Sequence, residues 1–206
     1  MSLPVPQVAS SLRTTWKLPI RGVGVFYGCS QIRRLSHYFL PEAIAEGKRI
    51  LYLDGANGFD PLLLARLARQ RGWVPSESNR QIRVARAFTC FQLTELLVRV
   101  PNLLKNFSAD AVILTGMPEL YFDEDVHVLD AISSFDHGLR ALRELAGRLP
   151  IAVFSTPSSF TTPRQKLFER IKAVAEQVCK FSVREDNALT ISNERVAPNG
   201  ALSGKG

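Results

Sequence analysis

Apolar positions follow two patterns that alternate along the chain. Short continuous apolar runs predict strands that are covered on both faces, because such strands have no polar side. Stretches in which apolar residues recur every three or four positions predict helices with one buried face. The expected strands span residues 23–27, 49–54, 82–88, 110–116 and 150–157. The expected helices span 31–46, 60–72, 89–100, 123–147 and about 164–177.

Local signals mark where several of these helices begin or bend. Asp60 followed by Pro61 is a typical helix start, since aspartate caps free backbone N–H groups and proline suits the first helical position. Thr89, with Gln92 three positions later, forms a capping box. Pro41 removes a backbone donor inside the first helix, so we expect it to kink or restart that helix.

Strands that alternate with helices predict an α/β fold with a mostly parallel central sheet flanked by helices. Two further apolar segments, "CKFSVRE" and "ALTISNERV", flank Asp186 and Asn187 and predict a C-terminal β-hairpin. We expect an N-terminal arm or linker at 1–20, one core domain at 21–196 and a disordered tail at 197–206. Ligands of such sheets bind beyond the carboxyl ends of the strands, so we expect the residues of a functional site to lie there.

The composition is that of a globular protein, and we expect a cytoplasmic location. The 206 residues are 46% hydrophobic and 22% charged. The sequence contains no run of about 18 apolar residues, so no membrane span is predicted. The N-terminal residues also lack the apolar stretch of a signal peptide. The three cysteines, Cys29, Cys90 and Cys179, form no CxxC pair, so we expect neither a disulfide framework nor a metal site.

The net charge of +7 is unevenly distributed. Residues 1–105 hold 15 Lys and Arg against 6 Asp and Glu, whereas residues 106–206 hold 11 against 13. The first part is therefore +9 and the second −2. Such an asymmetry can attract phosphate backbones or let copies associate head to tail, and it can also serve solubility alone.

Five segments carry a family resemblance when they are taken in order. They are "FYG" before the first helix, "RILYLDGANGF", "IRVARAFTCFQLTELL", "DAVILTGMPELYF" and "ALRELAGRLPIAVFSTP". Together they resemble the ATPase core of RecA/RadA-type recombinases and their paralogues, over roughly residues 20–195. The third segment is the most specific match, since it is similar to the family's "VYVARAYNxxxQxxLL". The resemblance implies a RecA-like core of the P-loop NTPase type.

Three features of the family's nucleotide site are absent at the matching positions. The loop at 28–30 is five residues shorter than the family's Walker A loop and lacks its Lys and second Gly. Ala56 stands where the family has the glutamate that activates the attacking water, although Asp54 before it is kept. Thr115 replaces the Walker B aspartate that supports Mg²⁺. The degenerate nucleotide site comprises Gly28, Cys29, Ser30, Asp54, Ala56 and Thr115.

These losses remove the phosphate cradle, the metal support and the water activator together. Because hydrolysis in such sites depends on positioning and electrostatics, we expect no ATPase activity and no ATP cofactor. The turn at 28–30 is interpreted chiefly as a tight connection between strand and helix. The other interpretation is a residual anion site, since any helix N-terminus binds anions modestly.

The resemblance also implies that the DNA-facing loops follow the fourth and fifth strands, at about 117–126 and 155–166. The first of these loops is acidic and suits phosphate poorly. The second could stack an aromatic ring on a base, or it could be an ordinary surface loop. The candidate nucleic-acid contacts are Phe160, Arg164, Lys166, Arg33 and Arg34.

Three functional hypotheses follow. The first is a non-hydrolysing RecA/RadA-like paralogue in DNA repair or recombination, which binds single-stranded DNA or a partner protein. The second is a regulatory or structural subunit of a RecA-like assembly without DNA binding of its own, or a protein that retains nucleotide binding. The third is an unrelated enzyme that uses Cys29, but this residue is interpreted as a half-buried filler because His37 lies on the wrong side of the helix.

Overall fold

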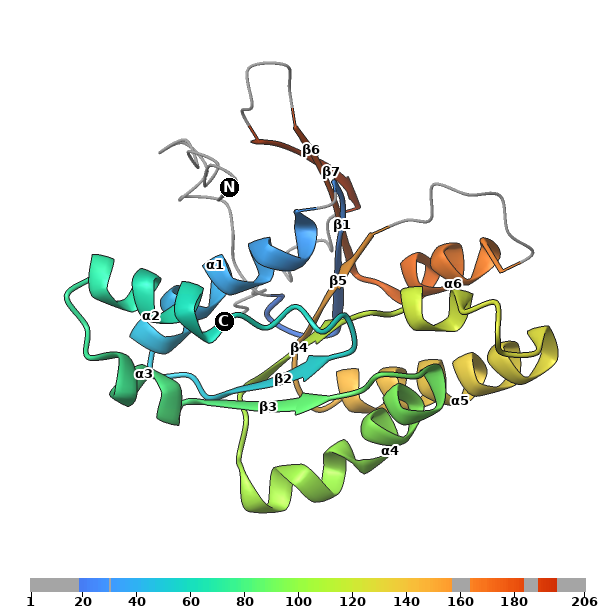
Figure 1. Ribbon diagram of the computed structural model, residues 1–206, viewed down its shortest axis with the longest axis horizontal. Helices are drawn as coiled ribbons and strands as arrows, with labels where there is room; N and C mark the ends of the chain where they lie inside the picture. Colours follow the sequence, from blue (N-terminus) through green and yellow to red (C-terminus); the bar gives the residue numbers. More distant parts are fainter. Residues whose placement is uncertain (1–18, 30, 157–163, 184–188, 196–206) are drawn as a thin grey trace, which may run out of the picture.

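The computed structural model describes residues 19–29, 31–156, 164–183 and 189–195. They form a seven-stranded sheet in the order β3-β2-β4-β5-β1-β6-β7, in which only the β6–β7 pair is antiparallel (Figure 1). The strands are β1 (Val23–Gly28), β2 (Ile50–Asp54), β3 (Ile82–Arg86), β4 (Ala111–Thr115), β5 (Ile151–Ser155), β6 (Gln177–Val183) and β7 (Leu189–Arg195). The expected strands, the parallel pairing and the C-terminal hairpin are therefore confirmed.

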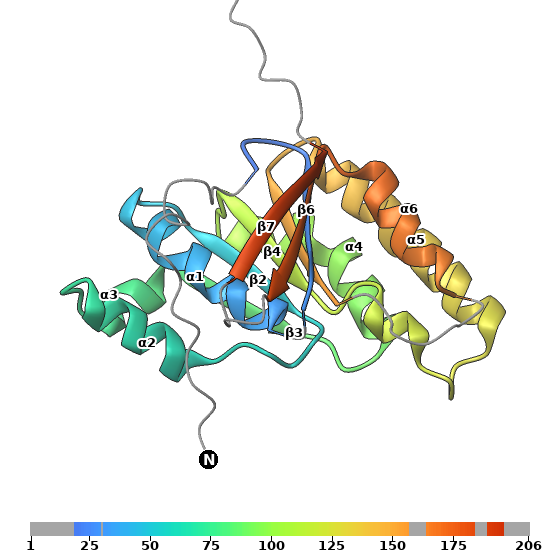
Figure 2. The same ribbon diagram turned by 90° about the horizontal axis from the view of Figure 1, so that it is seen from above.

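Helices cover both faces of the sheet, as Figure 2 shows from above. One face carries α1 (Ile32–Ala45), α2 (Pro61–Gln70) and α3 (Pro75–Arg80). The other face carries α4 (Cys90–Asn106), α5 (Val128–Ala146) and α6 (Lys166–Val174). No helix among the described residues is long and apolar enough to cross a membrane.

Alternation along the buried strands divides the core into two clusters, one on each face. On β1, Val25 and Tyr27 pack with α4, α5 and α6, whereas Phe26 between them packs with α1. The same alternation on β2 sends Leu53 to one cluster and Tyr52 to the other. Continuous apolar runs therefore formed strands because each of their two sides meets a layer of helices.

Two helix starts agree with their sequence signals. The Asp60 carboxylate accepts hydrogen bonds from the backbone N–H groups of Leu62 and Leu63, at 2.9 and 3.0 Å, with Pro61 at the first position of α2. The Thr89 hydroxyl accepts from the N–H of Gln92. In a capping box the Gln92 side chain would accept from the N–H of Thr89. Here it accepts instead from the N–H of Phe88, one residue earlier.

Three helix predictions were wrong in detail. Pro41 does not restart α1, because Ile32–Ala45 is one helix that buries Pro41 with its apolar neighbours. The long helix begins at Val128 rather than at 123, because a short 3₁₀ helix, η2 (Glu119–Phe122), and a turn come first. The last helix ends at Val174 rather than near 177, since Gln177 already pairs with β1. The short helix α3 had not been predicted.

Candidate functional site

The carboxyl ends of the parallel strands bring Gly28, Asp54 and Thr115 to one edge of the sheet, as the sequence predicted. At Gly28 the chain turns from β1 towards α1 with φ +139°. A Cβ atom at this position would lie 1.9 Å from the carbonyl oxygen of Phe181 on β6. The next N–H, that of Cys29, donates to the same carbonyl at 3.2 Å. Gly28 therefore serves the close approach of β6, and Ser30 lies outside the described residues.

The carboxylate of Asp54 is buried and its hydrogen bonds are made within the protein. It accepts from the backbone N–H groups of Gly58 and Phe59, at 2.9 and 3.0 Å. The hydroxyl of Thr115 donates to it at 3.1 Å, and the Nε atom of Arg86 lies 3.4 Å away. Asp54 thereby holds the loop after β2 against β4, and this role occupies both of its oxygen atoms.

The loops that follow β2 and β4 touch each other directly. The N–H of Gly55 donates to the carbonyl of Thr115 at 3.0 Å, and the N–H of Ala56 donates to its hydroxyl at 3.4 Å. A Cβ atom on Gly116, where φ is +83°, would lie 2.3 Å from the backbone of Gly55. The space between the positions of the family's catalytic glutamate and Walker B aspartate is thus filled by backbone.

Glu119, which the sequence analysis did not single out, reaches the same edge of the sheet. Its Oε1 atom accepts from the N–H of Thr156, just beyond β5, at 2.6 Å. Its Oε2 atom and the hydroxyls of Ser155 and Thr156 are buried without a hydrogen-bond partner in the part of the chain that is described. Burial raises the pKa of Glu119 to about 7, while the Thr156 N–H and the positive charge of Arg33 act in the opposite direction.

No spacing rule could have found Glu119, because it lies four positions after β4 and comes back to the sheet only through the turn of η2. It is nevertheless a carboxyl group with a strongly perturbed pKa at the edge where such sheets bind ligands. Its Oε1 bond to the β5 end shows that its present role includes fixing the segment after β4 to β5.

Arg164 is not an exposed nucleic-acid contact, and this prediction was wrong. Its side chain is 5% exposed and donates to the backbone carbonyls of Tyr121, Asp123 and Val126. The Tyr121 carbonyl belongs to η2, and the other two carbonyls belong to the stretch between η2 and α5, where the Asp123 carbonyl also accepts from the N–H of Val126. The buried guanidinium group of Arg164 therefore holds the acidic loop in place through its backbone carbonyls.

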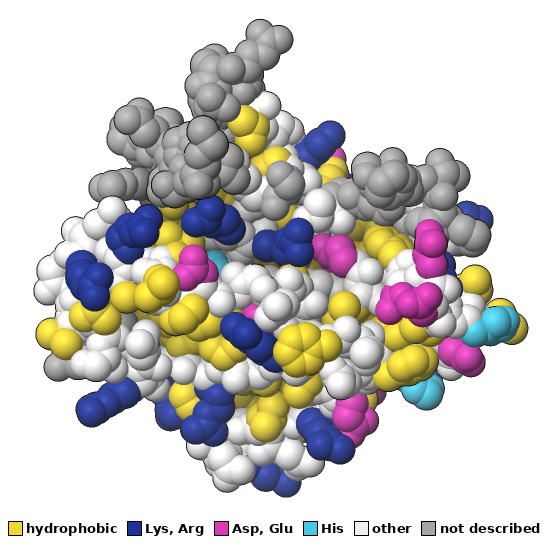
Figure 3. Space-filling model, viewed as in Figure 1, with side chains coloured by type: hydrophobic (Ala, Val, Ile, Leu, Met, Phe, Trp, Pro, Cys, Tyr) yellow, Lys and Arg dark blue, Asp and Glu magenta, His cyan; other side chains and the backbone are white. Residues whose placement is uncertain are grey.

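The remaining nucleic-acid candidates do not form one surface. Arg33 and Arg34 are exposed on the first turn of α1, and Lys166 is exposed at the start of α6 on the opposite face of the sheet (Figure 2). Phe160 lies outside the described residues. Figure 3 shows Lys and Arg side chains, in dark blue, spread over much of this face, with some of them over α1 and α2. The exposed arginines of these two helices are Arg33, Arg34, Arg66 and Arg69.

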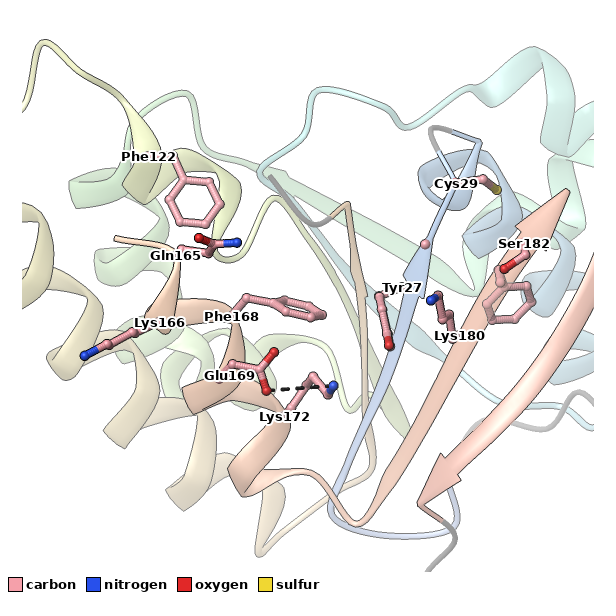
Figure 4. A pocket seen from close by; sticks show the side chains of 12 residues that line it. Tyr27, Cys29, Phe122, Gln165, Lys166, Phe168, Glu169, Lys172, Lys180 and Ser182 are labelled. Atoms are coloured by element: carbon pink, nitrogen blue, oxygen red, sulfur yellow. Dashed lines mark ion pairs between the residues drawn. The ribbon is translucent and has the colours of Figure 1, made fainter. Parts of the chain in front are cut away.

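A cavity of about 740 Å³ opens beside Gly28, on the face of the sheet that carries α6. Figure 4 shows Phe122 and Phe168 on one side of it, with Tyr27 and Lys180 on the other. Lys166 and Lys172 of α6 also line it. The walls thus come from β1, β6, η2 and α6, which are far apart in the sequence, and no sequence signal had marked them as one site.

One wall of this cavity is held by an ion-pair network. The hydroxyl of Tyr27 donates to Glu194 of β7, and burial together with this carboxylate raises the pKa of Tyr27 above its usual value. The ammonium of Lys172 lies 3.0 Å from Glu194 and 3.8 Å from Glu169. It also lies over the rings of Tyr27 and Phe168, at 5.2 and 5.7 Å from their centroids.

Cys29 is half-buried at the rim of the cavity, which agrees with its interpretation as a filler. His37 cannot serve as its base, because the His37 ring is fully buried and its Nε2 atom accepts from the N–H of Asp60 at 2.8 Å. Burial also lowers the pKa of His37, so the ring stays neutral.

Within the described ranges, no three His, Cys, Asp or Glu side chains are grouped so that they could hold a metal ion. Neither a scan against models of known protein families nor a search of curated proteins finds a match to this chain. The functional argument therefore rests on the geometry of the strand ends and of the surfaces around them.

Proposed function

We propose that the chain is a non-hydrolysing relative of the RecA/RadA-type recombinases that acts in DNA repair or recombination in the cytoplasm. It works by binding single-stranded DNA, a partner protein or both, and not by catalysis. The observation that carries the proposal is the closed network of Asp54, Thr115, Gly55 and Gly116 at the strand ends. The segments that resemble the family's nucleotide site end at the carboxyl edge of a mostly parallel sheet, and their polar groups form hydrogen bonds with one another.

The residues at this edge do not fit a nucleotide with its magnesium ion. A phosphate loop needs backbone N–H groups around open space, whereas the backbone at Gly28 lies against the carbonyl of Phe181. A metal site needs a carboxylate with free oxygen atoms, whereas both oxygens of Asp54 already accept hydrogen bonds. No step of a reaction is therefore assigned to this edge.

DNA binding is supported by the arginines of α1 and α2. Arg33, Arg34, Arg66 and Arg69 are exposed, and none has a carboxylate within ion-pair distance among the residues described. Both Arg34 and Arg66 act electrostatically on Tyr38, which lies between their helices. Arginines on two packed helices form a surface that can follow a phosphate backbone.

The first test measures hydrolysis and DNA binding on the same preparation. We expect no phosphate release from ATP with Mg²⁺, with or without DNA. We expect fluorescently labelled oligo(dT) to bind at low salt in an anisotropy titration. ATP turnover that stays with the chain through two different chromatographic steps would contradict the non-hydrolysing assignment.

A charge-matched pair of double variants locates the binding surface. Arg33→Glu with Arg34→Glu should weaken oligo(dT) binding by about 100-fold, since each lost phosphate contact costs roughly tenfold or less. Arg140→Glu with Arg143→Glu changes the net charge equally but lies on α5, on the opposite face. Equal losses in the two double variants would show only a general charge effect and would refute the α1 surface.

A second candidate, a subunit that contacts a protein and not DNA, is favoured by two exposed rings. Phe88 and Phe91 follow the edge strand β3 and are 63% and 50% exposed. Aromatic side chains of this kind are enriched at protein interfaces. Two results together would select this candidate. The unchanged chain fails to bind oligo(dT) at low salt, and the double variant Phe88→Ser with Phe91→Ser loses the self-association that light scattering detects in the unchanged chain.

A further inference from the structure

Glu119 and Arg33 both lie beside the loop that follows β2. A Cβ atom added to Gly58 in this loop would lie 3.7 Å from the Cβ atom of Arg33 on α1. A Cβ atom added to Gly55 would lie 3.2 Å from the side chain of Leu120, the neighbour of Glu119 on η2. The loop therefore packs against both the first turn of α1 and η2, and a carboxyl group and a guanidinium group come to the same edge of the sheet.

The groups that face Glu119 from the end of β5 are neutral. The Oε1 atom accepts from the N–H of Thr156 at 2.6 Å, and the Oε2 atom is buried. The hydroxyl of Ser155 also acts on the carboxyl group. Further along the segment of Glu119 itself, Asp123 is exposed, and the guanidinium group of Arg164 is bound to backbone carbonyls. The β5 end therefore offers Glu119 hydrogen-bonding groups and no counter-charge.

A positive charge acts on Glu119 from α1. The charge of Arg33 opposes the effect of burial on the pKa of Glu119. Arg33 is exposed and has no carboxylate within ion-pair distance in the described ranges. The other charged pair at this edge, Asp54 at the end of β2 and Arg86 at the end of β3, is already matched at 3.4 Å. Arg33 is thus a cation that both Glu119 and an incoming phosphate can attract.

We propose that Glu119 regulates the arginine surface of α1 and α2, because its ionised carboxylate competes with a DNA phosphate for Arg33. The inference rests on the proposed DNA binding and adds its regulation. A phosphate beside Arg33 and an ionised Glu119 carry charges of the same sign, so each disfavours the other. Such coupling is reciprocal, and DNA binding should therefore promote the uptake of a proton by Glu119.

DNA affinity should consequently fall as pH rises. The pKa of Glu119 is about 7 in the chain without DNA, so its carboxyl group is mostly protonated at pH 6 and mostly ionised at pH 8. This group should weaken oligo(dT) binding about threefold between these values, as expected for two charges in a partly screened environment. His127 and His137 are exposed and also titrate near this range, so the contribution of Glu119 is isolated with Glu119→Gln.

The test is an anisotropy titration with labelled oligo(dT) at low salt, at pH 6 and pH 8. Glu119→Gln is combined with Arg33→Gln and, as the matched control, with Arg69→Gln. Arg69 lies in the last turn of α2 on the same surface, and its replacement changes the net charge equally. At pH 8, Glu119→Gln should tighten binding about threefold in the unchanged chain and in the Arg69→Gln background, and much less once Arg33 is replaced. Melting curves confirm that each variant is folded.

Proton uptake gives a second readout that does not require a substitution at Glu119. Calorimetric titrations with oligo(dT) at pH 7, in two buffers of different ionisation enthalpy, measure the protons taken up on binding. The unchanged chain should take up a fraction of a proton, because the bound phosphate raises the pKa of Glu119. Arg33→Gln should take up less, whereas Arg69→Gln should resemble the unchanged chain.

The inference is overturned if Glu119→Gln has the same effect in the Arg33→Gln and Arg69→Gln backgrounds, or if proton uptake does not depend on Arg33. Either result leaves the proposed DNA binding intact, since oligo(dT) is bound in both. Oligo(dT) that fails to bind at pH 6 and at pH 8 would refute the proposed DNA binding, and this regulation with it. The two failures are therefore distinguishable.

Discussion

Glu119 shows how one side chain can link two strands that are separated in sequence. Its carboxyl group accepts a single hydrogen bond, from the N–H of Thr156 at 2.6 Å, while Oε2 is buried beside two unpaired hydroxyls. An ionised Oε2 can accept from one of these hydroxyls and a protonated Oε2 can donate to one, so hydrogen bonding alone does not select between the two forms. Burial, the largest effect on the pKa of Glu119, favours the protonated form.

Stability should consequently fall as pH rises. The pKa of Glu119 is about 7 in the folded chain and 4.5 in the reference state, so the native state binds more protons between these values. The group's contribution is fully present below pH 4.5 and is lost as pH rises to about 7, at a cost of about 3 kcal/mol. Glu119→Gln should remove this pH dependence, since the amide accepts from Thr156 and donates to a hydroxyl. Urea unfolding from pH 4.5 to 8 measures it.

The control for this substitution is Glu95→Gln, because Glu95 is exposed on α4 and pairs only with Arg99 at the surface. Its unfolding free energy should follow that of the unchanged chain at each pH, within a few tenths of a kcal/mol. If Glu119→Gln shows the same pH dependence as this control, Glu119 does not titrate in the assigned range.

Thr115 tests whether a carboxylate can be placed at the position that resembles the family's Walker B aspartate. Thr115→Asp would place a second carboxylate where the Thr115 hydroxyl now donates to Asp54, at 3.1 Å. Two buried like charges repel, and we expect a loss of roughly 3–5 kcal/mol of stability and no ATPase activity. Thermal unfolding measures the loss. Thr115→Ser keeps the donor and should stay close to the unchanged chain, and a stable, hydrolysing Thr115→Asp variant would show that the edge is open.

At the scale of elements, the segment between η2 and α5 is positioned from another part of the chain. Arg164, just before α6, donates to the carbonyls of Tyr121, Asp123 and Val126. The Asp123 carbonyl also accepts from the N–H of Val126, so the guanidinium group adds to the hydrogen bonds that the segment makes by itself. The loops after β4 and β5 are thereby coupled twice, by Arg164 and by Glu119.

Arg164→Ala should therefore act on stability. Three carbonyls lose a charged donor, and we expect a decrease of roughly 3–5 kcal/mol in the unfolding free energy. Arg140→Ala, on the exposed face of α5, should change it by less than about 0.5 kcal/mol. Denaturant unfolding compares the two variants. An Arg164→Ala variant with the stability of the unchanged chain would show that Arg164 does not stabilise the fold.

At the scale of the molecule, the uneven charge gives the proposed DNA binding a measurable signature. The first 105 residues carry +9, and four of their exposed arginines, Arg33, Arg34, Arg66 and Arg69, lie on α1 and α2. Each phosphate contact with a single strand releases about 0.7 counterions, so log affinity should fall linearly with log salt concentration. If four arginines take part, the slope is about −3, and the Arg33/Arg34 reversal should lower its magnitude by about 1.4. Anisotropy titrations between 50 and 300 mM salt measure the slope, and a slope near zero would argue against phosphate contacts.

The sequence by itself determined the layers of this protein. Apolar runs and three- to four-residue spacing are local properties, and they sufficed to place every predicted strand, the mostly parallel sheet and the terminal hairpin, although not the order of the strands. Asp60 and Thr89 marked helix starts for the same reason, because a cap bonds to residues two or three positions away. The sequence also shows that the loop at 28–30 has no Lys, and that Ala56 and Thr115 stand at the positions that resemble the family's glutamate and Walker B aspartate.

Only the tertiary structure decided which contacts the residues at these strand ends make. The contact of Gly28 with Phe181, the return of Glu119 to Thr156 and the burial of Arg164 each join segments more than 35 positions apart. The cavity beside α6 is built in the same way from four separate elements. Sequence spacing carries no information on such approaches, because they depend on how the sheet brings distant strand ends together.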